Sequence, residues 1–308
     1  MTTPSGRPSA TALSQPEGIA LAHALTARLA RDCGVRALAM KGPVSAHHGW
    51  RNPRHSSDAD LLVEPSGLAP LLSRLGELGW QQKPRYADHS VTLTHPLWPC
   101  ELDVHDRFPG FLAEPDVVFD ALWRTRSTIE LAHSPQPCTG PVGSAVVAAL
   151  HALREPEHGR HFHEFEHLVA RLQERPQMRE PIQALARETG ALRTLAPLFD
   201  RLGWAVTADP PALHSEAYAA WELRRTSGTT AGVTWLLRLR SAPVVRWPAL
   251  VPEMLLGRED RLRERFPQLP AGRRALWLAR WWRLRAAVRD LPAAFAAIRR
   301  YTRTRSAG

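Results

Sequence analysis

The amino-acid sequence predicts an α+β fold, in which a small mixed or antiparallel sheet with flanking helices is followed by an all-helical C-terminal domain. Short segments with strand-like alternation of apolar and polar residues lie between helical patterns up to about residue 138. Beyond that point the strand signals fade and helical periodicity dominates. Proline and glycine cluster near 135–141, within SPQPCTGP, and we place the domain boundary there.

Each predicted element follows from its local pattern. Residues 1–15 are small, polar and proline-bearing and are expected to form a disordered tail. The α+β domain then takes 16–138 and the helical domain takes 139–308. The predicted strands lie at 35–40, 58–63, 91–94 and 100–104. The predicted helices lie at 17–33, 43–49, 65–78, 142–153, 162–172, 182–202, 213–225, 233–239 and 275–288.

The charge of the chain favours phosphate-rich partners. The 308 residues carry a formal net charge of +10, and only Lys41 and Lys83 among the 40 basic residues are lysines. Such a surplus attracts nucleotides, nucleic acid or anionic membranes. The three cysteines lack CxxC spacing, which predicts free thiols in a reducing compartment. The N-terminal stretch has no signal-peptide pattern and no apolar run approaches 18 residues, so we expect a cytoplasmic protein without a transmembrane segment.

The most informative stretch is ALAMKGPVSAHHGWRNPRHSSDADLLV at 37–63. Asp58 and Asp60 are two residues apart in a predicted strand, so their side chains share one face. Neighbouring carboxylates repel each other unless a cation lies between them. Asp103, in the predicted strand ELDVH, can provide a third acid. Three such acids are the minimal set for nucleotidyl transfer assisted by two metal ions.

An alternative interpretation needs no metal. An acid beside a serine often caps a turn, and Asp58 follows Ser57 directly. The glycine turn at Lys41-Gly42, the basic loop with Arg54 and the LDVH strand together favour the metal site. In the same strand we expect His105 to orient its neighbours and Glu101 to be a hydrated residue at an edge.

The motifs KG at 41–42, R-x-x-SD-x-DLLV at 54–63 and LDVH at 102–105 resemble those of the uncharacterised bacterial nucleotidyltransferases in the DNA polymerase beta-type superfamily. The His-rich stretch at 151–172 and PEMLLGREDRLRERFP at 252–267 are similar to later segments of that family. The resemblance therefore covers most of the chain, and its motifs are most specific in the first 105 residues.

The resemblance implies both a site and an activity. Metal ions, Mg²⁺ or Mn²⁺, would be bound by Asp58, Asp60 and Asp103, which are also the catalytic acids. The nucleotide would be bound by Lys41, Gly42, Ser45, Arg54 and Ser57. The implied reaction moves a nucleoside monophosphate from an NTP such as ATP to a hydroxyl or phosphate acceptor on a peptide, RNA or small molecule, with natural-product biosynthesis as one setting. In the wider superfamily the turn usually reads Gly-Gly or Gly-Ser, whereas Pro43 follows Gly42 here. A catalytically inactive nucleotide- or partner-binding module of the same fold is the alternative.

Two other patterns compete with this interpretation. His163, Glu164 and His167 match the HExxH zinc-hydrolase motif, in which the two histidines bind zinc and the glutamate acts as base. A third zinc ligand would be Glu174, Glu180 or Glu188. The charged Glu166 inside the motif and the histidine-rich setting of 151–167 count against it. The helix near 272–291 mixes tryptophan, leucine and arginine, which permits peripheral contact with a membrane or with nucleic acid. We favour packing of its Trp-Leu stripe in the core.

Overall fold

The computed structural model describes residues 13–54, 56–83, 90–154 and 159–206, together with isolated positions and a helical stretch at 272–282 beyond them. The described residues fall into two compact units. The first takes those within 1–152 and 162–209, and the second takes those within 153–161 and 210–308. Residues 1–12 of the predicted tail at 1–15, and most of the predicted helices at 213–225 and 233–239, lie outside the described residues.

The first unit contains a mixed sheet of seven described strands in the order β3-β4-β5-β2-β1-β7-β6. β1 pairs with β7 and β2 with β5 in parallel, while the other neighbours are antiparallel. The mixed sheet is as predicted, but it is larger than expected from the sequence. The strands are β1 (Ala37–Met40), β2 (Asp58–Val63), β3 (Gln81–Gln82), β4 (Ser90–Thr94), β5 (Glu101–His105), β6 (Ser127–Leu131) and β7 (Ser134–Cys138).

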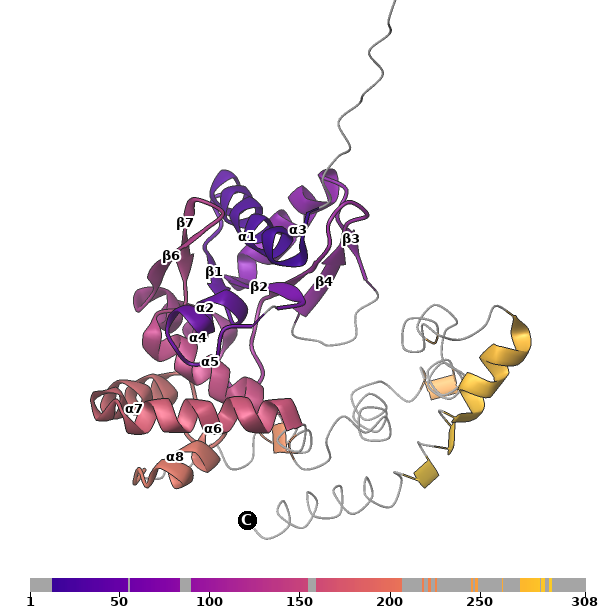
Figure 1. Cartoon of the computed structure of the whole chain (residues 1–308). Coiled ribbons are helices and arrows are strands. Elements are labelled where there is room, and N and C mark those ends of the chain that lie inside the picture. Colours follow the sequence, from indigo (N-terminus) through magenta and orange to yellow (C-terminus); the bar gives the residue numbers. More distant parts are fainter. Residues whose placement is uncertain are drawn as a thin grey trace, which may run out of the picture. The chain divides into compact units, whose positions relative to one another are not determined.

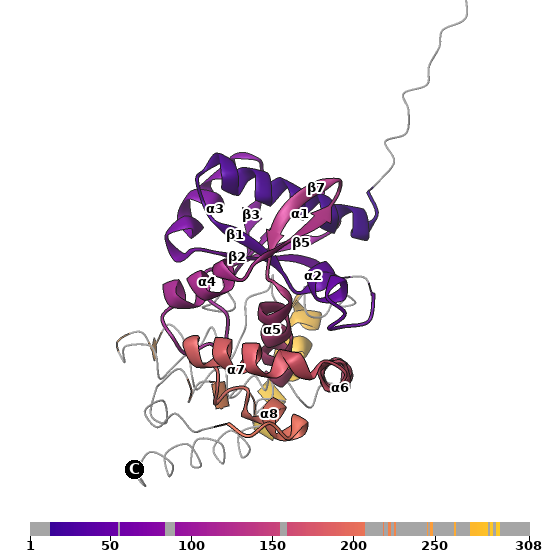
Figure 2. The ribbon, with the colours of Figure 1, turned by 90° about the vertical axis from the view of Figure 1, so that its left-hand side faces the viewer.

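Helices α1 (Gln15–Asp32) and α3 (Leu68–Glu77) cover one face of the sheet (Figures 1 and 2). Their apolar stripes and the inward-facing strand residues form one buried cluster that includes Ile19, Leu71 and Leu102. The capping box between Ser14 and Glu17 defines where α1 begins. Because side chains alternate along each strand, the polar residues of β2 and β5 face away from this core.

Most of the residues at the predicted domain boundary, 135–141, are part of the sheet or of the helix that follows it. The first of these residues form β7, which pairs with β6 along five positions and with β1 at Ala39 and Cys138. The prolines at 135 and 137 are tolerated because contact with β1 is confined to the C-terminal end of β7, where Thr139 N–H donates to Ala39 O over 3.0 Å. The helices that follow therefore begin inside the first unit and not after it.

The other described helices that lie wholly or mostly in this unit are α2 (Gly42–His47), α4 (Pro115–Arg124), α5 (Pro141–Leu153), α6 (Gly159–Gln173), α7 (Arg179–Glu188) and α8 (Ala196–Leu202), with short 3-10 turns η1 (Pro65–Gly67) and η2 (Pro176–Met178). The sequence predicted α5 and α6 and missed α4. It also predicted a single helix over 182–202, which the structure divides into α7 and α8. Gly190 adopts φ +69° between them, a conformation that ends a helix.

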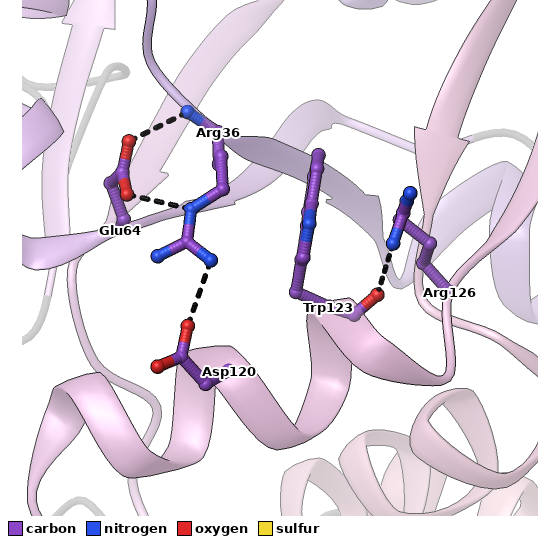
Figure 3. Close-up of polar contacts among 5 residues, drawn as sticks. All are labelled: Arg36, Glu64, Asp120, Trp123 and Arg126. Atoms are coloured by element: carbon purple, nitrogen blue, oxygen red, sulfur yellow. Dashed lines mark hydrogen bonds and ion pairs between the residues drawn. The ribbon is translucent and has the colours of Figure 1, made fainter.

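An arginine at the start of β1 connects α4 to the sheet (Figure 3). Arg36 donates from its backbone N and from Nε to the Glu64 carboxylate, and from Nη1 to Asp120 Oδ1, each over 2.8 Å. Its guanidinium also lies 5.8 Å from the ring centre of Trp123, which Arg126 approaches at 4.3 Å. These charge-assisted bonds and cation–π contacts hold α4 at the end of the sheet where β1 begins and β2 ends. Asp58 lies at the opposite end of β2.

In the second unit the prediction for the tryptophan-rich helix is wrong in one respect. Residues 273–282 are helical, and Leu276 and Ala279 are buried with Leu262. The tryptophans at 277, 281 and 282 are instead between 57% and 63% exposed, because they lie on another face of the helix than Leu276 and Ala279. They therefore do not form the core stripe that the sequence led us to expect.

Among the described residues there is no helix with the length and apolarity needed to cross a membrane.

Candidate active site

The parallel register of β2 and β5 brings acidic side chains together on the sheet face opposite the α1–α3 core. Asp60 pairs with Asp103, and Asp58 pairs with Glu101. Paired residues on adjacent strands point to the same side, so this register places four carboxylates on one face. The alternation of the two strands predicted that each pair of acids shares a face. The register that sets them side by side emerges only from the folded sheet.

Asp60, Asp103 and His105 can each offer one ligand atom to a metal ion, and these atoms lie within 4.8 Å of one another. Asp103 Oδ1 is buried and has no hydrogen-bond partner among the residues that the structure describes. A buried carboxylate oxygen without a donor is costly, and a bound cation would satisfy it. The carboxylate donors suit Mg²⁺ or Mn²⁺, so the residues present fit a divalent ion. Asp58, predicted as a ligand, is not part of this three-ligand group.

Asp60 is the most enclosed of the acids, at 4% exposure. Its Oδ1 accepts hydrogen bonds from Lys41 Nζ at 2.5 Å and from His105 Nε2 at 3.1 Å. Burial raises the pKa of Asp60, but the Lys41 charge and the His105 bond outweigh it and hold the pKa well below its usual range. Asp60 is therefore ionised at every pH of interest.

Burial and the Lys41 charge lower the pKa of His105, against the opposing effect of Asp60. The ring is then neutral near pH 7, with its proton on Nε2 to make the bond to Asp60. This agrees with the predicted orienting role of His105. His105 also belongs to the group of residues that could hold a metal ion, which the sequence did not indicate.

Asp58 has a different environment from Asp60, although both lie on β2. Burial, followed by the nearby Asp60 charge, raises the pKa of Asp58 to about 6, while Lys41 opposes this shift. Its Oδ1 accepts a 3.1 Å hydrogen bond from the Ser57 hydroxyl. Two carboxylates with opposite pKa shifts on one strand are typical of a functional site, because repulsion between them is relieved by a cation or a proton.

The turn after β1 is built around unusual backbone angles. Lys41 has φ +55° and ψ −144°, and Gly42 has φ +28°. A Cβ on Gly42 would lie 2.9 Å from Ser56 Oγ, so the basic loop passes directly over this glycine. Ser45 is buried in the six-residue helix α2, and its backbone N–H donates to Lys41 O over 2.8 Å. The predicted turn is present, and the loop that follows Gly49 closes over it.

Arg54, predicted to contact the nucleotide, is paired with an acid of α6. Its Nε and Nη2 donate to Glu164 Oε1 over 2.9 and 2.5 Å. Glu164 is the glutamate that the HExxH pattern requires. The second histidine of that pattern, His167, lies with its Nε2 atom 3.4 Å from Gly49 O. Across the described part of the chain, neither His163 nor His167 belongs to a group that could hold a metal ion. The described geometry thus gives the zinc-hydrolase alternative no support.

The sequence did not predict a contact between Lys83 and Glu101 on the acidic face of β2 and β5. Lys83 follows β3, and its Nζ donates to Glu101 Oε1 over 2.5 Å. Its backbone N donates to Thr92 O over 2.8 Å, and Thr92 pairs with Asp103. The signal that could have revealed it is composition, because both lysines of the chain contact carboxylates on this one face.

Comparisons with known proteins were made for the sequence and for the fold. A search of curated proteins finds no match. Among solved structures, an antigenic nucleotidyltransferase-like protein from Paracoccidioides brasiliensis is 12% identical with a TM-score of 0.39, covering 63% of this chain and 96% of that one. The lincosamide antibiotic adenylyltransferase LnuA, solved with lincomycin bound, is 17% identical with a TM-score of 0.30, covering 39% of this chain and 78% of that one.

The sequence profile of a family described as uncharacterised nucleotidyltransferase matches residues 19–201. This range includes β1, β2 and β5, and with them every predicted site residue. It also extends through α5 to α7, in agreement with the extent of the first unit. Because the match covers more than half of the chain, the protein belongs to this family of uncharacterised nucleotidyltransferases.

Proposed function

We propose that the protein is a divalent-metal-dependent nucleotidyltransferase that moves a nucleoside monophosphate from an NTP to a hydroxyl or phosphate acceptor. The observation that carries this proposal is the register pairing of Asp60 with Asp103, together with a buried Asp103 oxygen that has no hydrogen-bond donor among the described residues. Family membership supports the same reaction class. The acceptor can be a peptide, an RNA or a small molecule.

The acids of the two strands share metal binding in this reaction, and Asp103 has an additional role. Asp58 and Asp60 would hold the metal ions, together with Asp103, and His105 fixes the orientation of Asp60. A bound divalent ion supplies activation of the acceptor oxygen and offsets charge on the departing pyrophosphate. Asp103 lies on the neighbouring strand and would accept the proton of an acceptor hydroxyl. The acceptor oxygen forms a bond to the α-phosphorus, and the bond between the α- and β-phosphates breaks.

Basic residues around the turn would bind the triphosphate. Lys41 and Arg54 lie on either side of Gly42 in the chain and carry the positive charge for charge-assisted contacts. Ser45 and Ser57 add polar groups near the same turn. Arg54 now pairs with Glu164, so we expect the nucleotide to compete with this carboxylate for the guanidinium.

The proposal is tested with labelled NTPs, Mg²⁺ and host extract, followed by mass spectrometry of the labelled product. Transfer should depend on the metal and should be lost in Asp103→Asn, which keeps the shape of the side chain while removing its charge and its ability to accept a proton. NTP binding by this variant should be largely retained. Asp116→Asn, on the exposed first turn of α4, is the matched control and should transfer normally.

Normal turnover by Asp103→Asn would contradict its assigned role. Nucleotide binding without pyrophosphate release, with every NTP and extract tried, would instead favour the inactive binding module of the same fold.

A further inference from the structure

The backbone of Lys41 adopts a conformation that residues with a side chain rarely take. Its φ of +55° with ψ of −144° lies close to a region populated almost only by glycine. Gly42 follows immediately, so the turn has a flexible residue beside this strained lysine. Strained backbone of this kind persists where the surrounding structure enforces it, and it clusters at functional sites. The strained backbone therefore indicates that the position of the Lys41 side chain is important for function.

Composition supports a specific need for an ammonium group. Lysine occurs twice in a chain with 40 basic residues, and both lysines contact acids on the β2–β5 face. A lysine ammonium is a compact point charge on a flexible stem, whereas the guanidinium of arginine is a planar fork. The compact charge can approach a single carboxylate oxygen as a small cation does, and its stem allows it to move away again.

The Lys41 side chain lies where a cation on Asp60 would repel it. Its Nζ is 2.5 Å from Asp60 Oδ1, and the side chain is only 15% exposed. The ammonium also lies 5.4 Å from the ring centre of Phe108. A divalent ion bound by Asp60 and Asp103 would bring a second positive charge to the same carboxylate. Like charges at this separation in a buried site repel strongly, so the ammonium and the ion compete for Asp60.

We propose that Lys41 is an internal counter-ion of Asp60 that couples metal binding to nucleotide binding. The inference rests on the proposed function, since it requires an NTP at this turn. Triphosphate oxygens attract the Lys41 ammonium away from Asp60, and the vacated carboxylate then binds the metal more tightly. Because coupling between two ligands is reciprocal, the metal tightens nucleotide binding by the same factor.

The coupling is measured as Mn²⁺ affinity by electron paramagnetic resonance, with and without saturating α,β-methylene analogues of ATP, GTP, CTP and UTP. Mn²⁺ binding by the analogue itself is identical for all variants, so the variants are compared with one another. Lys41→Met removes the ammonium and keeps an aliphatic chain against Phe108. We expect this variant to bind Mn²⁺ about tenfold more tightly without nucleotide, and to show a coupling factor about tenfold smaller, within the usual range for coupled ligands.

Two further variants make the result independent of folding and of general charge effects. Lys41→Gly also removes the ammonium and relieves the backbone strain, so it should fold and should reproduce the effect on Mn²⁺ affinity. Lys83→Met removes the other lysine of the same face, which pairs with Glu101 on the neighbouring strand, and should tighten Mn²⁺ binding less and preserve the coupling.

The inference is overturned if both Lys41 variants bind Mn²⁺ no more tightly than the wild type, or if Lys83→Met changes the affinity as much as they do. If the wild type binds Mn²⁺ and an analogue but with no coupling, this inference alone fails. Failure of the wild type to bind either ligand would contradict the proposed function as well.

Discussion

A buried histidine in α1 should make the protein less stable in mild acid. His23 is fully buried, and neither of its ring nitrogens has a hydrogen-bond partner within the described part of the chain. Burial lowers the pKa of His23 to about 4, although the Asp60 charge opposes the shift. In the unfolded chain its pKa is about 6.5. The folded state therefore resists protonation of this ring, and the unfolded state does not.

The sign and size of the effect follow from linkage. Between pH 6.5 and pH 4 the unfolded chain binds more protons at this position than the folded one, so the free energy of unfolding falls as the pH falls. From pH 7 to pH 5 the loss from His23 is about 2 kcal/mol. Asp58 acts in the opposite direction, because its pKa is raised to about 6 in the folded state and protonation of that state is favoured.

The contribution of His23 is isolated by comparing the wild type with His23→Leu, because the Asp58 effect is common to both. Urea unfolding at pH 5, 6 and 7, followed by circular dichroism, gives the free energy of unfolding of each. The leucine variant should be at least as stable at pH 7, since it removes unsatisfied buried nitrogens. Between pH 7 and pH 5, its free energy of unfolding should change by about 2 kcal/mol in the stabilising direction relative to the change of the wild type. An equal change in the two proteins would refute the reasoning.

Two further predictions concern the framework around the site. A Cβ on Gly140 would overlap the Thr125 carbonyl oxygen, so Gly140→Ala should lower the free energy of unfolding by about 1–3 kcal/mol, measured with urea. The control Gly76→Ala lies in helix α3 with open space around it and should stabilise by about 0.5–1 kcal/mol. Arg36→Met breaks the bonds to α4 and should cost about 1–2 kcal/mol in the same assay. Arg28→Met, which removes an exposed 4.0 Å pair, should change stability by less than about 0.5 kcal/mol, and equal losses in the two arginine variants would contradict the role of Arg36.

The central strands and their acids could be predicted from the sequence because local patterns specify them. Alternation in DADLLV and ELDVH separates acids from apolar residues, and the folded sheet keeps that separation. The contact of Lys41 with Asp60 could not be predicted in the same way. It depends on the backbone angles of a turn and on pairing between residues 19 positions apart, which no local pattern encodes.

The errors also have identifiable physical causes. The sequence placed a domain boundary within β7 because Pro135 and Pro137 resemble loop residues, yet the short contact of β7 with β1 leaves room for both prolines. The pairing of Arg54 with Glu164 joins residues 110 positions apart and is invisible before folding. The Trp-Leu pattern near residue 280 gives the helical period correctly, but the period alone does not say which face is buried.

A crystal structure of the protein with Mn²⁺ and an α,β-methylene NTP analogue, in which anomalous scattering locates the metal, tests the proposed site most directly. We predict an anomalous peak bound by Asp60 and Asp103, with Lys41 Nζ moved from Asp60 to the phosphates. A peak at the α6 histidines, or phosphates bound away from the Gly42 turn, would contradict the central claim.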